Sequence, residues 1–126
     1  FIDVDNFKRY NDTCGHLEGD KLLIKVAQLL KLSIRKTDSV YRYGGDEFTV
    51  ILPQTHAEDA KIVAKRIINN MRNENFLLEN GEYTEISISV GISEYYSEED
   101  LETFIKRADQ AMFSSKREGH NRITSC

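Results

Sequence analysis

Hydrophobic side chains recur at helical spacing in three long segments of the chain. In residues 20–33 the apolar positions fall three or four apart on one face, which predicts an amphipathic helix. The same spacing predicts a second helix that follows Thr55, where Thr55 and Glu58 have the pattern of a capping box. A third helix that carries Leu101 is predicted next, and Ser97 with Asp100 could cap it. A shorter helical turn is predicted at residues 7–13.

Alternation of apolar and polar residues predicts strands in the remaining segments. Extended runs lie on both sides of Gly44 and Gly45, which predicts a hairpin, because glycine enters a tight turn with positive φ at no steric cost. Residues 84–93 alternate strictly, residues 1–5 resemble the end of a strand, and residues 120–124 suit a short one. This order predicts an α/β fold, namely an α+β sandwich in which helices flank a central mixed, mainly antiparallel sheet.

Length and charge narrow the classes of function. The 126 residues suit one domain, and a net charge of -4 provides no general attraction for nucleic acid, so no nucleic-acid partner is expected. An anionic ligand therefore needs a local device, such as a metal ion or a few placed cations. The two cysteines share no metal-ligand spacing, which favours reduced thiols in a cytoplasmic protein. No apolar run approaches the roughly 20 residues of a membrane span, although a segment elsewhere in the parent protein could anchor it.

Four acidic side chains are candidates for a metal site. Asp3 and Asp5 lie two apart on the first strand and therefore on one face, while Asp46 and Glu47 follow the two glycines at the hairpin tip. If the first strand lies beside the hairpin, Asp3 and Asp46 converge. Two carboxylates, a backbone carbonyl and water form the hard oxygen site that Mg²⁺ prefers. Taken singly, each acid is better explained as a solvated strand-end or turn residue.

These acids belong to longer motifs. The segment Arg42-Tyr43-Gly44-Gly45-Asp46-Glu47-Phe48 resembles the signature for which the GGDEF family of diguanylate cyclases is named. Further segments are similar to that family in the same order along the whole chain: residues 1–8, 10–12, 15–20, 87–92, 107–112 and 116–121. The resemblance implies a nucleotidyl-cyclase-like fold. It also implies an enzyme, a nucleotidyltransferase of bacterial signal transduction that condenses two GTP into cyclic di-GMP and two pyrophosphates.

The resemblance assigns metal-binding and catalytic roles to five residues. Asp3, the backbone carbonyl of Val4 and Asp46 would hold Mg²⁺, with Mn²⁺ as a possible substitute. Glu47 would add a further acidic group to the same site. Asp46 would accept the proton of the attacking ribose 3′-hydroxyl, and Lys8 would stabilise charge on the phosphates during transfer. Attack on the α-phosphorus builds negative charge, so cations and a proton acceptor suit this chemistry.

Five further positions match substrate contacts of the family. Asn11 and Asp20 would bind the guanine edge, Phe7 and His16 would contact the nucleotide, and Lys116 would approach the terminal phosphates. Without the resemblance, the lysine is an ordinary solvated residue, and the asparagine and histidine are turn or cap residues.

An Arg-x-x-Asp motif lies before the hairpin. Its placement resembles the inhibitory site of the family, where Arg35 and Asp38 would bind cyclic di-GMP and Arg66 would add a secondary contact. Arginine suits bidentate recognition of phosphate and guanine. The product is therefore expected to be an allosteric inhibitor, although the motif alone occurs too often to carry meaning.

Two features depart from the family pattern. His120 stands where the family usually has an arginine that holds the terminal phosphates, and histidine is shorter and largely neutral at cytoplasmic pH. The helix and the Leu-Thr-Gly-Leu-like segment that family members carry before the first strand are absent. Residues 1–126 are thus expected to be a GGDEF catalytic domain that lacks its N-terminal helix and the start of its first strand.

The resemblance also implies partners. Each domain presents one GTP, so catalysis requires a homodimer, and a regulatory domain is expected on the same parent chain. The alternative is a catalytically inactive GGDEF module that binds GTP or cyclic di-GMP as a signalling receptor. A cyclase for adenine nucleotides is disfavoured by Asp20, because a carboxylate accepts hydrogen bonds from guanine and repels the acceptor edge of adenine.

Overall fold

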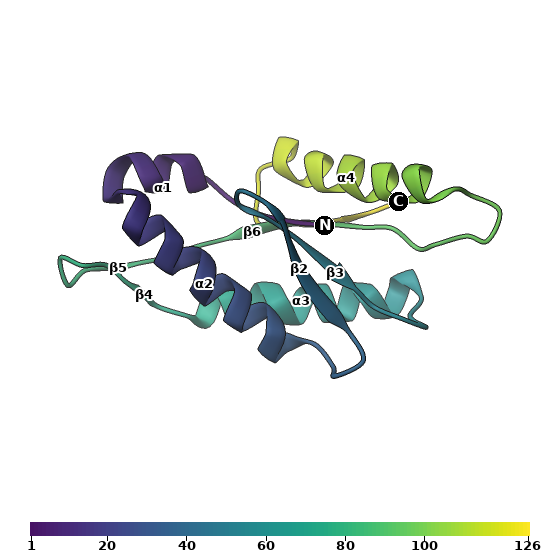
Figure 1. The fold of residues 1–126 in the computed structure, drawn as a ribbon, viewed down its shortest axis with the longest axis horizontal. Helices are drawn as coiled ribbons and strands as arrows, with labels where there is room; N and C mark the ends of the chain where they lie inside the picture. The colour runs from purple at the N-terminus through teal and green to yellow at the C-terminus, as the bar shows by residue number, and fades with distance from the viewer.

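The computed structural model describes all residues 1–126 as four helices, a five-stranded sheet and a two-stranded hairpin (Figure 1). In chain order the elements are β1 (Ile2–Val4), α1 (Phe7–Cys14), α2 (His16–Ser33), β2 (Ser39–Gly44), β3 (Glu47–Ile51), α3 (Ala57–Asn73), β4 (Phe76–Leu77), β5 (Tyr83–Thr84), β6 (Ile88–Ile92), α4 (Leu101–Arg117) and β7 (Ile123–Ser125). None of the helices combines the length and apolar character needed to cross a bilayer.

The large sheet has the strand order β2-β3-β1-β6-β7. Every neighbouring pair is antiparallel except β6 and β7, which run parallel. Helix α4 lies on one side of this sheet, and α2 and α3 lie on the other (Figure 1). The prediction of a mixed, mainly antiparallel sheet flanked by helices is therefore confirmed.

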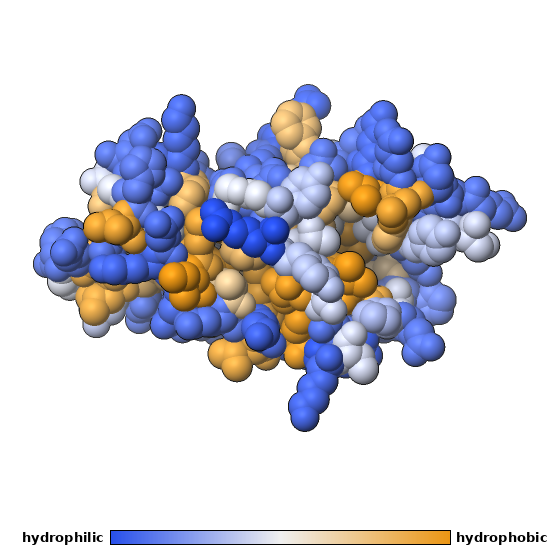
Figure 2. All heavy atoms as spheres, viewed as in Figure 1, coloured by the Kyte–Doolittle hydropathy of each residue, from blue (hydrophilic) through white to orange (hydrophobic).

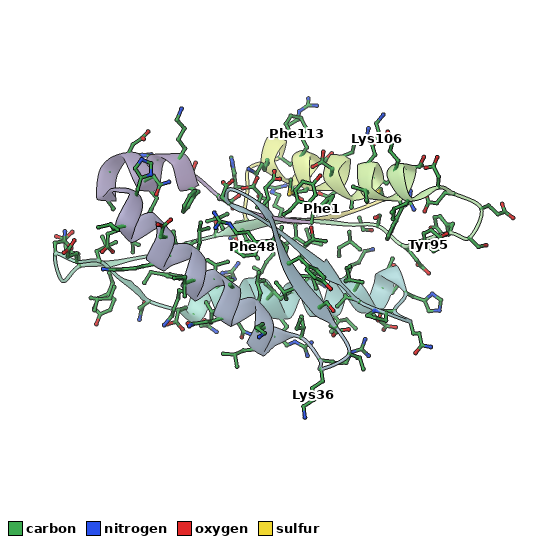
Figure 3. All side chains as sticks on the ribbon, in the orientation of Figure 1. Phe1, Lys36, Phe48, Tyr95, Lys106 and Phe113 are labelled. Atoms are coloured by element: carbon green, nitrogen blue, oxygen red, sulfur yellow. The ribbon has the colours of Figure 1, made fainter.

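Strand alternation divides the sheet into an apolar and a polar face. Ile2 and Val4 of β1, together with Ile88 and Val90 of β6, are buried in the core that α2 and α3 cover. Figure 3 shows the labelled Phe48, a member of this core, in the middle of the molecule. Since successive side chains point to opposite faces, the residues between them face α4. The polar face is therefore the one that carries candidate chemistry.

Helix α4 packs directly against the backbone of β6 at Gly91. A Cβ atom at this glycine would lie 2.1 Å from the backbone N of Met112 and 2.3 Å from the backbone O of Ala108. The Ser115 hydroxyl adds a buried hydrogen bond of 2.9 Å to the Val90 carbonyl. These contacts fix the helix relative to the strand beside β1.

The capping box predicted at Thr55 is wrong. Helix α3 has His56 as its N-cap residue, with no side-chain cap. The Thr55 hydroxyl donates to the Pro53 carbonyl at 2.9 Å and is thus engaged one residue before the cap position. Helix α4 is capped by Asp100 and not by the expected pair of Ser97 with Asp100: the Asp100 carboxylate accepts from the Thr103 amide at 2.7 Å.

Two other boundaries differ from the sequence-based expectation. The alternating run at 84–93 is divided, because only residues Ile88–Ile92 join the large sheet as β6, while β5 pairs with β4. Helix α2 begins at His16, four residues earlier than expected, and includes Gly19. A Cβ at Gly19 would lie 1.7 Å from Asn11 Oδ1, so glycine is needed for the contact between α1 and α2.

Candidate nucleotide and metal site

The end of β1 and the tip of the β2–β3 hairpin meet in space. Asp3 pairs with Glu47 across the antiparallel ladder, so the two side chains lie on the same face of the sheet. The backbone amide of Val4 donates to the Asp46 carbonyl at 3.1 Å. The strand adjacency on which the convergence of Asp3 and Asp46 depended is therefore present.

Asp3 is a buried carboxylate with one cationic and one anionic neighbour. Its Oδ2 atom lies 2.6 Å from Lys116 Nζ. Burial raises the pKa of Asp3 to about 7; the Lys116 ammonium opposes the rise, and the charge of the Asp46 carboxylate adds to it. Asp46 is thus an acidic neighbour of Asp3.

The donor set fits a hard divalent cation that brings further ligands with it. Asp3 Oδ1 is buried and has no hydrogen-bond partner, which is costly for a carboxylate oxygen. No group of three or more acidic, histidine or cysteine side chains is arranged to hold a metal ion by itself. Two carboxylates and a backbone carbonyl leave positions for phosphate oxygens and water, the arrangement that suits Mg²⁺ bound together with a nucleotide.

Lys116 reaches this site from the last turn of α4. Its side chain is 28% exposed, and its ammonium supplies a positive charge beside Asp3. In the protein without metal or nucleotide, this cation offsets the repulsion between Asp3 and Asp46.

A second group of candidate residues lies where α1 meets α2. Asn11 Oδ1 is buried against Gly19 without a hydrogen-bond partner, and the Phe7 ring also touches that position. Asp20 follows directly and lines an open cleft of about 560 Å³ together with Arg42 at the end of β2. An amide oxygen and a carboxylate both accept hydrogen bonds, as the donors of a guanine edge require.

Two candidates stand apart from both groups. Lys8 on α1 and His16 at the start of α2 are exposed. Neither forms an ion pair or side-chain hydrogen bond in the structure, so their assigned contacts remain predictions that require a bound nucleotide.

Comparison with known proteins decides the family. The family described as "Diguanylate cyclase, GGDEF domain" matches residues 1–122. The chain belongs to the GGDEF family. Diguanylate cyclase A of Treponema denticola is 41% identical over 124 residues, which are 98% of this chain and 33% of that protein. Diguanylate cyclase DosC of Escherichia coli K12 is 39% identical over 97% of this chain and 26% of its own length.

Solved structures agree with this assignment. Diguanylate cyclase SiaD of Pseudomonas aeruginosa, solved with its activator SiaC, superposes with a TM-score of 0.95 at 34% identity, covering 99% of this chain and 48% of SiaD. The GGDEF domain of DgcB from Caulobacter crescentus, solved with c-di-GMP, gives 0.93 at 32% identity, covering 98% and 74%. The chain spans about a quarter to a third of the curated cyclases named above.

The Arg-x-x-Asp motif of this GGDEF domain forms a compact cluster. The Arg35 guanidinium donates to both carboxylate oxygens of Asp38 at 3.2 Å, and its Nη2 also donates to Thr55 Oγ1 at 2.9 Å. Burial alone would raise the pKa of Asp38, but hydrogen bonds from Arg35 and the charge of Arg66 hold it below its ordinary value. The fold therefore brings Arg35, Asp38 and Arg66 together.

This arginine cluster and the acidic site lie at opposite ends of one strand. The cluster precedes Ser39, and β2 then runs to Gly44 beside the hairpin tip. Five steps of about 3.3 Å give a separation of roughly 17 Å along the strand. A ligand at one position is therefore distinct from a ligand at the other.

A large apolar cavity is lined by no acid of the metal site and by none of Arg35, Asp38 and Arg66. It has a volume of about 960 Å³ and is lined mainly by apolar residues, including Phe1, Ile51 and Leu101, without Asp3 or Asp46. Figure 2 shows hydrophobic side chains gathered on the side of the molecule that is drawn there. The scarcity of charged groups makes it unsuitable for a triphosphate.

Asp5 is one of the four acids considered from the sequence, but the family resemblance assigns it no role. Asp5 is buried and faces the same side of the sheet as Ser87 and Ser89, whose hydroxyls it binds. The signal was available in the sequence, since an acid and two serines at alternating strand positions predict a polar cluster on one face.

Proposed function

We propose that this GGDEF domain is a diguanylate cyclase that joins two GTP molecules into cyclic di-GMP. The observation that carries the proposal is the convergence of Asp3 and Asp46 beside Lys116, within a chain of this family. Two acids and one cation at the end of a strand suit the alignment of a phosphoryl group.

The residues of the site divide the chemistry between them. Asp3, the Val4 carbonyl and Asp46 would hold Mg²⁺ or Mn²⁺, with Glu47 adjacent. When bound, the ion would offset negative charge on the phosphate oxygens. The Asp46 carboxylate takes the proton of the ribose 3′-hydroxyl. The bond from that oxygen to the α-phosphorus forms as the bond to the leaving oxygen breaks, and pyrophosphate departs.

Two lysines and the residues around the nucleotide have the remaining roles in the proposed reaction. Lys8 and Lys116 offset charge on the phosphates during transfer. Asn11 and Asp20 bind the guanine edge, with Phe7 and His16 beside the nucleotide. Because one domain presents one GTP, two copies must face each other for both bonds to form, so the active species is a homodimer.

The direct test is product analysis. Full-length protein incubated with GTP and Mg²⁺ is expected to give cyclic di-GMP and two equivalents of pyrophosphate, measured by chromatography and mass spectrometry. ATP is expected to give no cyclic dinucleotide, because Asp20 repels the adenine edge. Removal of divalent ions with EDTA should abolish turnover. Absence of product at high protein concentration, where dimers form, would show that the enzyme assignment is wrong.

The alternative of an inactive receptor module has one observation in its favour. His120 stands in place of an arginine and adopts a positive φ of 62° in the turn after α4. Calorimetric titration with GTP and with cyclic di-GMP separates the two functions. A receptor binds at least one nucleotide and yields no product, whereas a cyclase binds GTP and turns it over.

We further propose that cyclic di-GMP inhibits the enzyme at the cluster of Arg35, Asp38 and Arg66. The pairing of Arg35 with a buried carboxylate orients its guanidinium, which reduces the entropy lost when it binds phosphate or guanine. The position at the opposite end of β2 leaves the acidic site free to hold GTP at the same time.

Replacing Arg35 with alanine is expected to raise the cyclic di-GMP concentration needed for half inhibition by about tenfold or more, since a bidentate contact is lost. Each variant is compared with its own rate in the absence of added product. Lys36→Ala is the matched control, because this neighbouring side chain points into solvent (Figure 3). Equal inhibition of Arg35→Ala and Lys36→Ala would exclude the cluster as the inhibitory site.

A further inference from the structure

Asp5 is a buried acid whose hydrogen bonds join three segments. Its side chain is only 5% exposed. Oδ1 accepts from the Ser89 hydroxyl at 2.6 Å, and Oδ2 accepts from the Ser87 hydroxyl at 2.6 Å and from the Asn121 backbone amide at 3.0 Å. The carboxylate thus connects the end of β1 to β6 and to the turn between α4 and β7.

The turn that Asp5 holds has an unusual backbone. Gly119, His120 and Asn121 have φ values of 120°, 62° and 49°, all in the left-handed region. Non-glycine residues adopt this conformation at a cost of about 1–2 kcal/mol each, so surrounding contacts must maintain it. The His120 amide donates to the Ser115 carbonyl at 3.1 Å, and the Asn121 amide donates to Asp5.

The same turn continues from the helix end that carries Lys116. The amide of Gly119 donates to the Lys116 carbonyl at 3.4 Å, while the Lys116 ammonium contacts Asp3. Asp3 and Asp5 are two residues apart on one face of the chain. The end of β1 therefore holds the end of α4 at two points, one through a side chain and one through the turn.

The body of α4 has separate anchors. Gly91 lies against the backbone of Met112, and the Ser115 hydroxyl binds the Val90 carbonyl and Thr124 Oγ1. Loss of the Asp5 contact should therefore loosen the turn and leave the helix in place.

We propose that Asp5 is a positioning residue for the triphosphate of GTP: by holding residues 119–121 against β1, it sets where His120 meets the terminal phosphates. This rests on the proposed function, in which the end of α4 faces the nucleotide phosphates. Asp5 itself is too deeply buried to touch substrate. Its effect is transmitted through the Asn121 amide.

The test compares two nucleotides that differ only in their terminal phosphates. 3′-Deoxy-GTP and 3′-deoxy-GMP lack the attacking hydroxyl, so neither can be cyclised during calorimetric titration of the full-length protein with Mg²⁺. Asp5→Asn keeps the shape of the side chain but places an N–H₂ donor where one of three donors now binds. It is expected to lose about tenfold in affinity for the triphosphate, the cost of a contact worth about 1.4 kcal/mol, and less than about twofold for the monophosphate.

Ser115→Ala is the control for stability, because it removes buried hydrogen bonds of α4 without touching the turn. It should lower the melting temperature and leave the ratio of the two affinities unchanged. If Asp5→Asn does not fold, Ser89→Ala removes only the Oδ1 partner and should lower the ratio by about threefold.

The outcomes separate the two claims. If the wild-type protein binds the triphosphate no more tightly than the monophosphate, the proposed phosphate site is wrong. The positioning role of Asp5 is then wrong as well, because it depends on that site. The wild-type protein can instead bind the triphosphate much more tightly than the monophosphate. If Asp5→Asn or Ser89→Ala then keeps this preference, or lowers the affinity for both nucleotides equally, only the positioning role of Asp5 is overturned. A selective loss for the triphosphate supports it.

Discussion

Replacing Asp46 with alanine is expected to reduce cyclic di-GMP formation by about a thousandfold or more, to the background of the assay. The change removes a proposed metal ligand and the proposed proton acceptor at once, and loss of general-base catalysis by itself costs about 10²–10⁴ in rate. The measurement is the initial rate of cyclic di-GMP release from full-length protein with saturating GTP and Mg²⁺.

Two comparisons make this result specific to Asp46. Asp46→Asn keeps the size of the side chain but loses its charge, and it should be nearly as inactive. Glu98→Ala removes an exposed acid from the loop before α4 and should retain the wild-type rate. The melting temperature of Asp46→Ala is expected to stay close to that of the wild type, since the Asp46 backbone carbonyl still binds Val4. More than a tenth of the wild-type activity in Asp46→Ala would contradict the assigned role.

Replacing Gly91 with alanine is expected to destabilise the domain by about 3 kcal/mol or more, as severe overpacking does. The added Cβ would lie 2.1 Å from Met112 N and 2.3 Å from Ala108 O. Both are backbone atoms of α4, so no rotamer change relieves the clash and the whole helix must move. Unfolding by urea, followed by circular dichroism, measures the loss.

Gly44→Ala is the matched control for this effect on stability. Gly44 has no neighbouring atom within 4 Å of its would-be Cβ and no positive φ. Its replacement should change the free energy of unfolding by less than about 1 kcal/mol. Equal unfolding midpoints for the two variants would mean that α4 does not pack on β6 as described.

Replacing Gly91 should also change the geometry of the acidic site. Helix α4 carries Lys116 to Asp3, so a displaced helix withdraws the cation from the carboxylate. The stability of this interface and the geometry of the site therefore depend on the same close approach of helix and strand.

Much of the fold follows from local patterns in the sequence. The glycines at 44 and 45 mark the hairpin turn because Gly45 adopts a φ of 52°, which is costly for most residues. Apolar periodicity located α2, α3 and α4, because each helix buries one face. The capping-box prediction failed at Thr55, because the Thr55 hydroxyl donates to the Pro53 carbonyl instead of capping the helix.

By itself, the sequence determined the family, the alternation that puts Asp3 on a polar strand face, and the hairpin that presents Asp46. These features depend on residues close together in the chain. Only the tertiary structure decided that β1 lies between β3 and β6, that Lys116 contacts Asp3, and that Asp5 holds the turn at residues 119–121. Each of these contacts joins residues distant in sequence. Burial of the apolar sheet face against α2 and α3 and the close packing of α4 on β6 fix them together, which no local pattern encodes.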